Sequence, residues 1–155
     1  MRVESRLHEG TQFEIYLPKS DGKNIETPEV KEAVNSHILS ILFIEDDEDQ
    51  LDSVPRVLAS LGHSVKAVKD PLKALEMIEQ EGAVFDLVIS DYDMPTMRGT
   101  QLAERLPDLP FIIVSGRDDA ISASMPYRNI CKVLIKPYDK TDIQWALNLV
   151  FLQEN

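Results

Sequence analysis

From Ile38 onward the chain alternates between short apolar runs and segments whose apolar residues have helical spacing. Several of the runs are apolar at every position, which is typical of strands buried on both faces of a parallel sheet. The runs are Ile38–Ile44, Ser64–Val68, Leu87–Ser90, Phe111–Val114 and Val133–Ile135. Five such strand and helix units in succession predict an α/β fold with a doubly wound, five-stranded parallel sheet flanked by five helices.

The segments between these runs predict the helices. The expected apolar faces are Leu51, Val54, Leu58 and Leu61 in the first helix, Leu72, Leu75 and Ile78 in the second, and Leu102, Ala103 and Leu106 in the third. Asp119–Met125 is the fourth helix, and Asp139–Leu152 is the fifth with Asp139 as its N-cap. Pro55 removes a backbone donor inside the first helix, so we expect a kink or a late helix start there.

A polar stretch separates these units from a different N-terminal segment. Residues 19–36 combine Gly and Pro with charged side chains, which is typical of a linker. Residues 2–5 and 11–17 predict a β-hairpin, and because an isolated hairpin is marginal in water, we expect the rest of its sheet to precede Met1. The predicted organisation is a fragment over residues 1–18, the linker over 19–36 and one domain over 37–155.

Composition excludes several classes of protein. The chain has 155 residues, 43% of them hydrophobic, which is enough for one substantial core. The net charge of -11, from 16 basic and 27 acidic residues, argues against binding nucleic acid, because phosphate backbones are bound by clustered Lys and Arg. A single cysteine, Cys131, cannot form an internal disulfide, and no apolar stretch approaches the roughly 20 residues that span a bilayer. We therefore expect a cytoplasmic fragment without membrane contact, although its parent protein could be anchored.

Polar residues that are candidates for a functional site directly follow four of the five predicted strands. Glu45 and Asp46 follow the first strand, Asp91 the third, Ser115 the fourth and Lys136 the fifth. The carboxyl ends of parallel strands meet at one edge, where clustered carboxylates repel one another unless a cation lies between them. Carboxylate oxygens suit Mg²⁺, so the sequence predicts a magnesium site. A metal, an ammonium and a hydroxyl around one further carboxylate would let that carboxylate attack phosphorus, and we expect Asp91 to be this nucleophile.

Four motifs are similar to those of response-regulator receiver domains. They are FIEDDED, LVISDYDMPTMRG, IIVSG and LIKPYD, and the resemblance covers Ile38–Asn155 with matching order and spacing. It implies a flavodoxin-like sheet with strand order 2-1-3-4-5 and a function in a two-component phosphorelay. The phosphoryl group would come from the phosphohistidine domain of the parent or of a partner kinase, and a histidine phosphotransfer protein would be a further partner.

The resemblance also implies a role for each site residue. Asp91 would be the phosphoacceptor, with Ser115 as the switch hydroxyl and Lys136 as the conserved lysine. Asp46 and Asp91 would bind Mg²⁺ directly, together with the backbone carbonyl of Asp93, and Glu45 would act through water. Lys136-Pro137 would be a cis peptide. The chain departs from the family at Val133, where an aromatic residue often stands, and at Asp93, which adds a carboxylate near the phosphoryl group.

The N-terminal fragment has a resemblance of its own. VESRLHEGTQFEIYLP, residues 3–18, looks like the last two strands of a histidine-kinase ATP-binding domain. The ATP-binding boxes of that family are not found in this sequence, so the fragment should neither bind ATP nor phosphorylate histidine. The resemblance implies that the parent is a hybrid sensor histidine kinase whose receiver follows its catalytic domain.

Two other functions compete with this interpretation. Asp91-Tyr92-Asp93 after an apolar strand also resembles the Asp-x-Asp motif of haloacid-dehalogenase-type phosphatases. That family places its nucleophile near the start of the domain and its acidic pair after the lysine, whereas here the acidic pair comes first. The second alternative, an interaction-only pseudo-receiver, would require an incomplete site.

Several further residues have simpler interpretations. We expect Asp47, Glu48 and Asp49 to form a solvated helix start, and His8, His37 and His63 to be solvated in loops. In the fifth helix, Ile143, Ala146, Leu147 and Val150 suffice to face the sheet. Trp145, Leu149 and Leu152 then form a second apolar stripe. This stripe predicts a homodimer or docking on the kinase, unless the N-terminal segment folds back over it.

Overall fold

The computed structural model describes residues 2–6, 10–14, 38–80 and 82–153. The chain forms two compact units, Met1–Asn35 and Ser36–Asn155. In the first unit, β1 (Arg2–Arg6) pairs antiparallel with β2 (Gly10–Glu14). The predicted hairpin is confirmed, while the proposed continuation of its second strand to Leu17 and the linker over 19–36 lie outside the described residues.

The second unit contains one parallel sheet of five strands. In chain order these are β3 (Ser40–Ile44), β4 (Ser64–Val68), β5 (Leu87–Asp91), β6 (Phe111–Ser115) and β7 (Ile130–Ile135). Their order across the sheet is β4-β3-β5-β6-β7, which is the predicted order 2-1-3-4-5 within this unit. The predicted fold class is therefore confirmed.

Burial explains how well each strand could be predicted. Every residue of the central strands β5 and β6 is buried, so their sequences are continuous apolar runs. The edge strand β7 is mostly half-buried and admits Lys132, which interrupts the apolar run. The prediction consequently started this strand at Val133, whereas it begins at Ile130.

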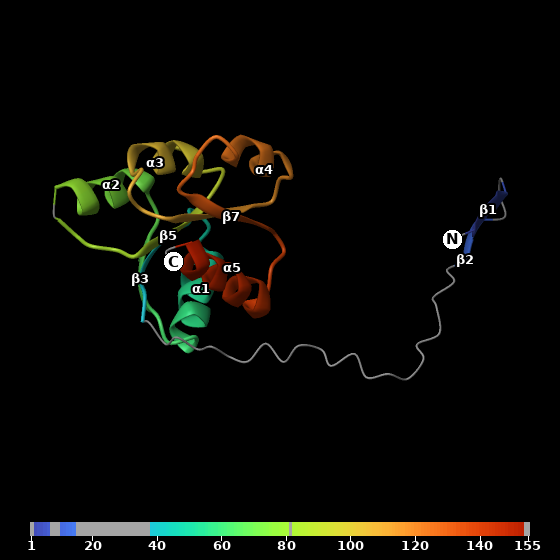
Figure 1. Ribbon diagram of the computed structural model, residues 1–155, viewed down its shortest axis with the longest axis horizontal. Helices are drawn as coiled ribbons and strands as arrows, with labels where there is room; N and C mark the ends of the chain where they lie inside the picture. Colours follow the sequence, from blue (N-terminus) through green and yellow to red (C-terminus); the bar gives the residue numbers. More distant parts are fainter. Residues whose placement is uncertain (1, 7–9, 15–37, 81, 154–155) are drawn as a thin grey trace. The chain divides into compact units, whose positions relative to one another are not determined.

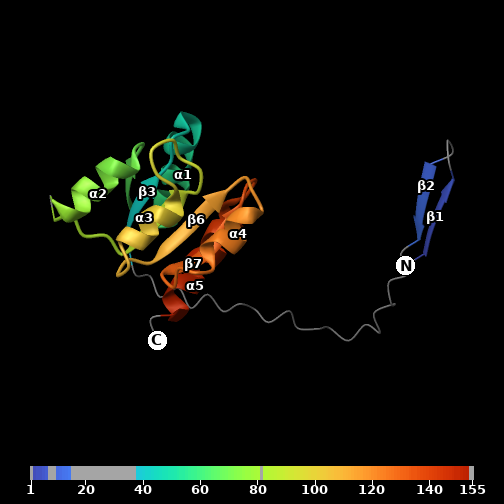
Figure 2. The same cartoon turned by 90° about the horizontal axis from the view of Figure 1, so that it is seen from above.

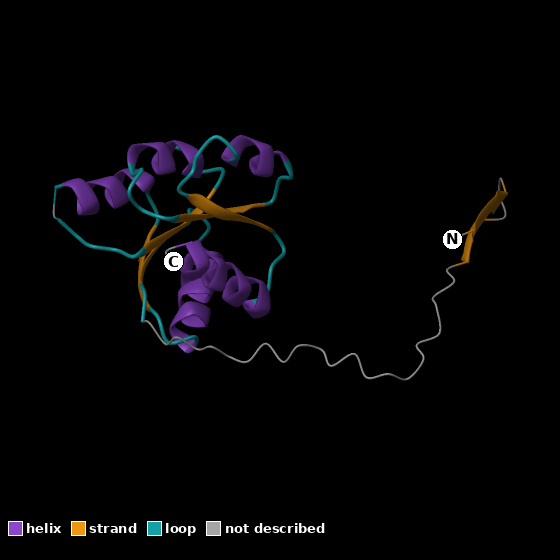
Figure 3. Ribbon diagram, in the orientation of Figure 1, coloured by secondary structure: helices purple, strands orange, loops and turns teal. Residues whose placement is uncertain are grey.

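The helices form a layer on each face of the sheet (Figures 1 and 3). They are α1 (Glu48–Ser60), α2 (Pro71–Glu79), α3 (Gly99–Arg105), α4 (Asp119–Ser124) and α5 (Lys140–Gln153). Figure 1 shows α1 and α5 on one face and α2, α3 and α4 on the other, and the two apolar cores divide in the same way. Figure 2 shows α3 beside β6 and α4 beside β7. Among the described residues, no helix has the length and apolar character needed to cross a membrane.

The structure corrects two details of the helix predictions. Helix α1 begins at Glu48 and continues through Pro55, so the late start is wrong. Leu72 is 46% exposed, and Pro71 and Ala74 are buried in α2 instead. We expected both Leu72 and Leu75 to face the core. Leu72 lies in the first turn of α2, where Pro71 is buried in its place.

Candidate functional site

The sheet brings the predicted site residues to one edge. Glu45 directly follows β3, Asp91 ends β5, Ser115 ends β6 and Lys136 directly follows β7. These four strands are consecutive neighbours, and Asp91 pairs with Val114 in register. The backbone N–H of Lys136 donates to the carbonyl of Ser115 at 2.7 Å, which extends the ladder to the lysine. Parallel pairing alone therefore places residues that are distant in sequence at a common edge.

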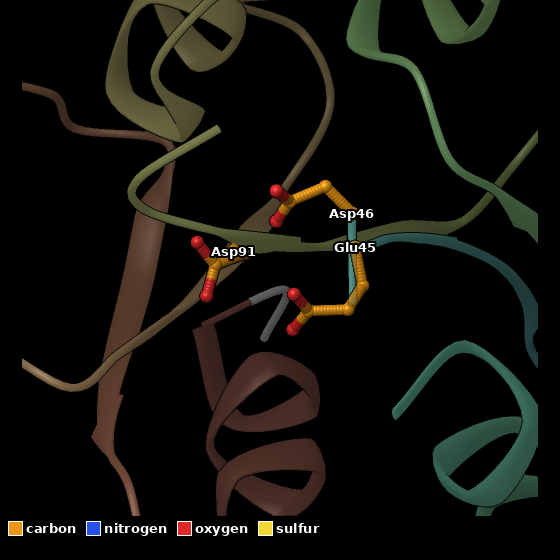
Figure 4. Close-up of side chains that lie close together, drawn as sticks. All are labelled: Glu45, Asp46 and Asp91. Atoms are coloured by element: carbon orange, nitrogen blue, oxygen red, sulfur yellow. The ribbon is translucent and has the colours of Figure 1, made fainter. Parts of the chain in front are cut away.

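Three carboxylates converge at this edge. One carboxylate oxygen from each of Glu45, Asp46 and Asp91 lies within 4.8 Å of the others. Figure 4 shows the three side chains turned toward one another, Glu45 and Asp46 from the end of β3 and Asp91 from the end of β5. Glu45 is 1% exposed and Asp91 is 6% exposed, so two of the three charges are removed from solvent.

Lys136 neutralises part of this charge. Its Nζ donates to Asp91 Oδ1 at 2.7 Å and to Glu45 Oε2 at 2.9 Å. Burial raises the pKa of Asp91, and the hydrogen bond from Lys136 opposes this rise without cancelling it. Burial also raises the pKa of Glu45, again against Lys136 and with a further upward contribution from the charge of Asp91. Lys136 thus offsets only part of the effect of burial on these two carboxyls.

The second oxygen of Asp91 and the hydroxyl of Ser115 are held by backbone donors. The N–H of Asp93 donates to Asp91 Oδ2 at 2.8 Å, and the N–H of Arg117 donates to Ser115 Oγ at 3.0 Å. Both acceptor side chains are buried. The peptide bond between Lys136 and Pro137 is cis, as the motif resemblance implied.

Gly99 is a residue that the sequence reasoning did not single out. A Cβ at this position would overlap the backbone carbonyl oxygen of Asp91, and it would lie 3.1 Å from both Ser90 Oγ and Ile113 Cδ1. Gly99 N also donates to the carbonyl of Tyr92 at 3.0 Å. The start of α3 can therefore approach the end of β5 only without a side chain. The glycine near the end of LVISDYDMPTMRG was the available signal.

Among the residues given simpler interpretations, Asp47, Glu48 and Asp49 agree with the structure, whereas His8 and His37 lie outside the described residues. Asp47, Glu48 and Asp49 are exposed at the start of α1, where Asp47 accepts a hydrogen bond from Gln50 N at 3.0 Å. Asp139 caps α5 as predicted, by accepting from the N–H of Thr141. His63 lies in a loop, as predicted, but its interpretation as solvated is wrong. Its ring is half-buried, and its Nδ1 accepts a hydrogen bond from Leu39 N at 3.3 Å.

The donor set fits a hard divalent cation. The cluster offers three carboxylate oxygens at close range, and such ligands suit Mg²⁺. Burial raises the pKa of both carboxyls, and the hydrogen bonds from Lys136 oppose this rise without cancelling it. A divalent ion among the three oxygens would add positive charge and favour the ionised forms.

Comparison with known proteins assigns the family. The family model of the response regulator receiver domain matches residues 41–148 of this chain. The chain belongs to this family. Receiver domains bind Mg²⁺ at an acidic pocket, and Glu45, Asp46 and Asp91 form such a cluster in this receiver domain. The family match also favours the receiver over the haloacid-dehalogenase-type phosphatase.

Curated relatives are regulators and kinases of two-component signalling. The sensor kinase CckA of Brucella abortus is 32% identical over 149 residues, which cover 87% of this chain and 16% of that protein. The two-component response regulator ARR12 of Arabidopsis thaliana is 33% identical over 103 residues, covering 64% of this chain and 17% of the relative. The chain thus spans about a sixth of the length of these relatives.

Solved structures share the fold of the receiver domain. A signal receiver domain of an HD domain-containing protein from Pseudomonas fluorescens matches with a TM-score of 0.66 and 24% identity, covering 76% of this chain and 97% of that one. The chemotaxis protein CheY4 of Vibrio cholerae matches with a TM-score of 0.65 and 20% identity, covering 74% and 99%. At these identities the likeness supports the fold alone.

Proposed function

We propose that this receiver domain accepts one phosphoryl group from a phosphohistidine on the carboxylate of Asp91, in a Mg²⁺-dependent reaction. The observation that carries the proposal is the part-buried contact between Lys136 Nζ and Asp91 Oδ1 at 2.7 Å, within a carboxylate cluster suited to a metal. Phosphoryl transfer depends mainly on positioning and on neutralising the oxygens of the moving group. Asp91 contacts one cation, the Lys136 ammonium, and belongs to a carboxylate cluster that could hold a second cation.

The family resemblance implies the metal ligands, and the clustering of the carboxylates of Glu45, Asp46 and Asp91 supports this set. Asp46 and Asp91 would bind the ion directly with the backbone carbonyl of Asp93, and Glu45 would act through water. When bound, Mg²⁺ supplies charge stabilisation for the phosphoryl oxygens. Because Glu45 already accepts from Lys136 at 2.9 Å, its main role in this arrangement is to hold the lysine beside Asp91.

Within this domain, Asp91 is the group that changes covalently in the proposed reaction. A carboxylate oxygen of Asp91 attacks phosphorus, the bond from phosphorus to the histidine nitrogen breaks, and the imidazole leaves with the electron pair. The ammonium of Lys136 moves its hydrogen bond from Asp91 to a phosphoryl oxygen. The hydroxyl of Ser115, now accepting from Arg117 N, can rotate to donate to the same group.

The parent protein is proposed to be a hybrid sensor histidine kinase. The similarity to the sensor kinase CckA covers 87% of this chain, which is more than Ser36–Asn155 alone could supply, so it includes part of the N-terminal segment. The proposed organisation is a kinase-domain fragment over residues 1–18, a linker over 19–36 and a receiver over 37–155. The phosphoryl donor is then a histidine domain of the parent or of a partner kinase, in a cytoplasmic setting, with a histidine phosphotransfer protein as a further partner.

Helix α5 is proposed as a contact surface for a second copy or for the kinase. Trp145 is 52% exposed on α5, and the ammonium of Lys132 on β7 lies 4.3 Å from the centre of its ring. Leu149 is half-buried, and the side chain of Leu152 lies outside the described residues. Sedimentation of wild type and Trp145→Glu, each with and without beryllofluoride, tests self-association. A monomer under all four conditions would exclude the homodimer.

Intact-mass measurement tests the main proposal. Incubation with a phosphorylated histidine domain and Mg²⁺ should add one acid-labile phosphoryl group, and a chelator should prevent the addition. Continued turnover of a phosphate monoester, or equal labelling with the chelator present, would contradict it.

A further inference from the structure

A second set of charges lies at the mouth of the site, on the two loops that follow β5 and β6. Asp93 comes two residues after Asp91, and Arg117 comes two residues after Ser115. The Arg117 Nη1 atom is 3.7 Å from Asp93 Oδ2. An ion pair therefore joins the loop that follows the acceptor to the loop that follows the hydroxyl.

Backbone hydrogen bonds tie this pair to the reacting groups. The N–H of Asp93 donates to Asp91 Oδ2 at 2.8 Å, and the N–H of Arg117 donates to Ser115 Oγ at 3.0 Å. The backbone N–H of each charged residue thus binds the reacting side chain that precedes it, and its charged side chain pairs with the residue on the other loop. A movement of either loop changes the charge near Asp91.

A second carboxylate fixes the guanidinium. Asp119, the first residue of α4, accepts from Arg117 Nε at 2.9 Å and from Nη2 at 2.5 Å. This two-bond arrangement leaves Nη1 on the side of Asp93, and it restrains an otherwise flexible side chain. The hydrogen bonds to Asp119 raise the pKa of Arg117, with a further contribution from Asp93, so its charge is present at every working pH.

The charge balance shows why such an arrangement matters. A phosphoryl group carries about 1.5 to 2 negative charges at neutral pH and must approach a site that already holds three clustered carboxylates. Asp93 adds a fourth at the mouth, and Lys136 is committed to Asp91 and Glu45. Even with Mg²⁺ bound in the cluster, the carboxylate of Asp93 would oppose the approach of an anionic donor unless another cation neutralised it.

We propose that Arg117 is a positioning residue that neutralises Asp93, so that the acceptor site stays open to phosphoryl anions, with Asp119 holding the guanidinium in place. The inference rests on the proposed function of Asp91. Removing the guanidinium should weaken binding of a phosphoryl-like anion and, by the same electrostatics, strengthen binding of Mg²⁺. Removing the carboxylate of Asp93 should do the reverse, and removing both should nearly restore the wild-type affinities.

The expected effects are modest because both side chains are partly solvated, with Arg117 58% and Asp93 43% exposed. Exposed pairs of this kind change an affinity by roughly two- to fivefold. Salt screens such charges over about 10 Å at 0.1 M, so the titrations should be run at low ionic strength.

The experiment compares Arg117→Gln, Asp93→Asn and the double variant in two titrations followed by NMR. One titration adds Mg²⁺ alone, and the other adds beryllofluoride at saturating Mg²⁺. We expect Arg117→Gln to bind beryllofluoride two- to fivefold more weakly and Mg²⁺ more tightly, with opposite changes for Asp93→Asn. The matched control is Arg56→Gln, which removes an exposed arginine paired with Asp52 on α1 and should change neither affinity.

Two results would overturn the proposal. Unchanged affinities in Arg117→Gln would show that its charge does not reach the site, and a parallel loss of both affinities would show a purely structural role. Failure of the proposed function has a different signature, because beryllofluoride would then bind Asp91→Asn as tightly as wild type.

Discussion

Lys136 Nζ lies 2.7 Å from Asp91 Oδ1 and bridges the ends of two strands that are not adjacent in the sheet. The strand between them, β6, ends at Ser115. Burial alone would lower the pKa of the Lys136 ammonium, but its hydrogen bonds to Asp91 and Glu45 outweigh burial and raise it. The lysine is therefore charged when a phosphoryl group arrives.

Replacing Lys136 with Met should slow phosphorylation of Asp91 without weakening Mg²⁺ binding. The variant loses the cation that offsets the phosphoryl oxygens, and comparable losses of one stabilising donor reduce rates by roughly a hundredfold. Mg²⁺ affinity should be equal or higher, because a competing positive charge is removed. Stopped-flow phosphorylation and a metal titration on the same sample provide the two readings. Weaker Mg²⁺ binding in this variant would contradict the role assigned to the lysine.

Asp46→Ala should weaken Mg²⁺ binding by at least about tenfold, and Asp49→Ala should leave it nearly unchanged. Asp46 belongs to the carboxylate cluster, whereas Asp49 is exposed in the first turn of α1. The two residues are three apart and carry the same charge, so the comparison separates direct ligation from a general loss of negative charge. Superimposable calorimetric titrations of the two variants would exclude the proposed ligand set.

Gly99→Ala should reduce both stability and the rate of phosphorylation. The added methyl group would overlap the carbonyl oxygen of Asp91, which must shift together with the acceptor side chain. Gly116→Ala is the matched control, because nothing lies within 4 Å of a Cβ built there. Thermal unfolding and phosphorylation rates of both variants check this. Equal behaviour of the two would show that the close approach of α3 to β5 is unimportant.

His63 should make stability depend on pH. Burial lowers the pKa of this imidazole below its ordinary value of 6.5, and its Nδ1 accepts from Leu39 N only when it is unprotonated. The unfolded chain therefore takes up the proton first, so this contribution to stability is complete above about pH 6.5 and is lost as the pH falls toward the folded-state pKa. Urea unfolding at pH 7.5 and 5.5 should show a larger loss in wild type than in His63→Gln. Identical losses would assign the pH dependence to other groups.

The sequence predicted the sheet well because three of its five strands are buried on both faces and have to be apolar. It predicted the clustering of Glu45, Asp46 and Asp91 for a related reason. Glu45 and Asp91 are polar residues at the ends of apolar strands, a position in which a parallel sheet brings them together.

Features that depend on tertiary contacts were missed. His63 was predicted to be solvated because its partner, the backbone of Leu39, lies in another part of the sequence. Asn129 likewise gave no signal, although its side-chain amide donates to the carbonyls of Ala103, Leu106 and Leu109 around the end of α3. Side chains that bond to distant backbone atoms leave no periodic pattern.

The most direct test of the account compares Asp91→Asn with Asp93→Asn. Each variant loses one carboxylate, and the two positions are only two residues apart, but of the two only Asp91 is in contact with Lys136. After incubation with a phosphorylated histidine domain and Mg²⁺, intact-mass measurement should show one added phosphoryl group on wild type and Asp93→Asn and none on Asp91→Asn. Labelling of Asp91→Asn at the wild-type level would contradict the assignment of Asp91 as the acceptor.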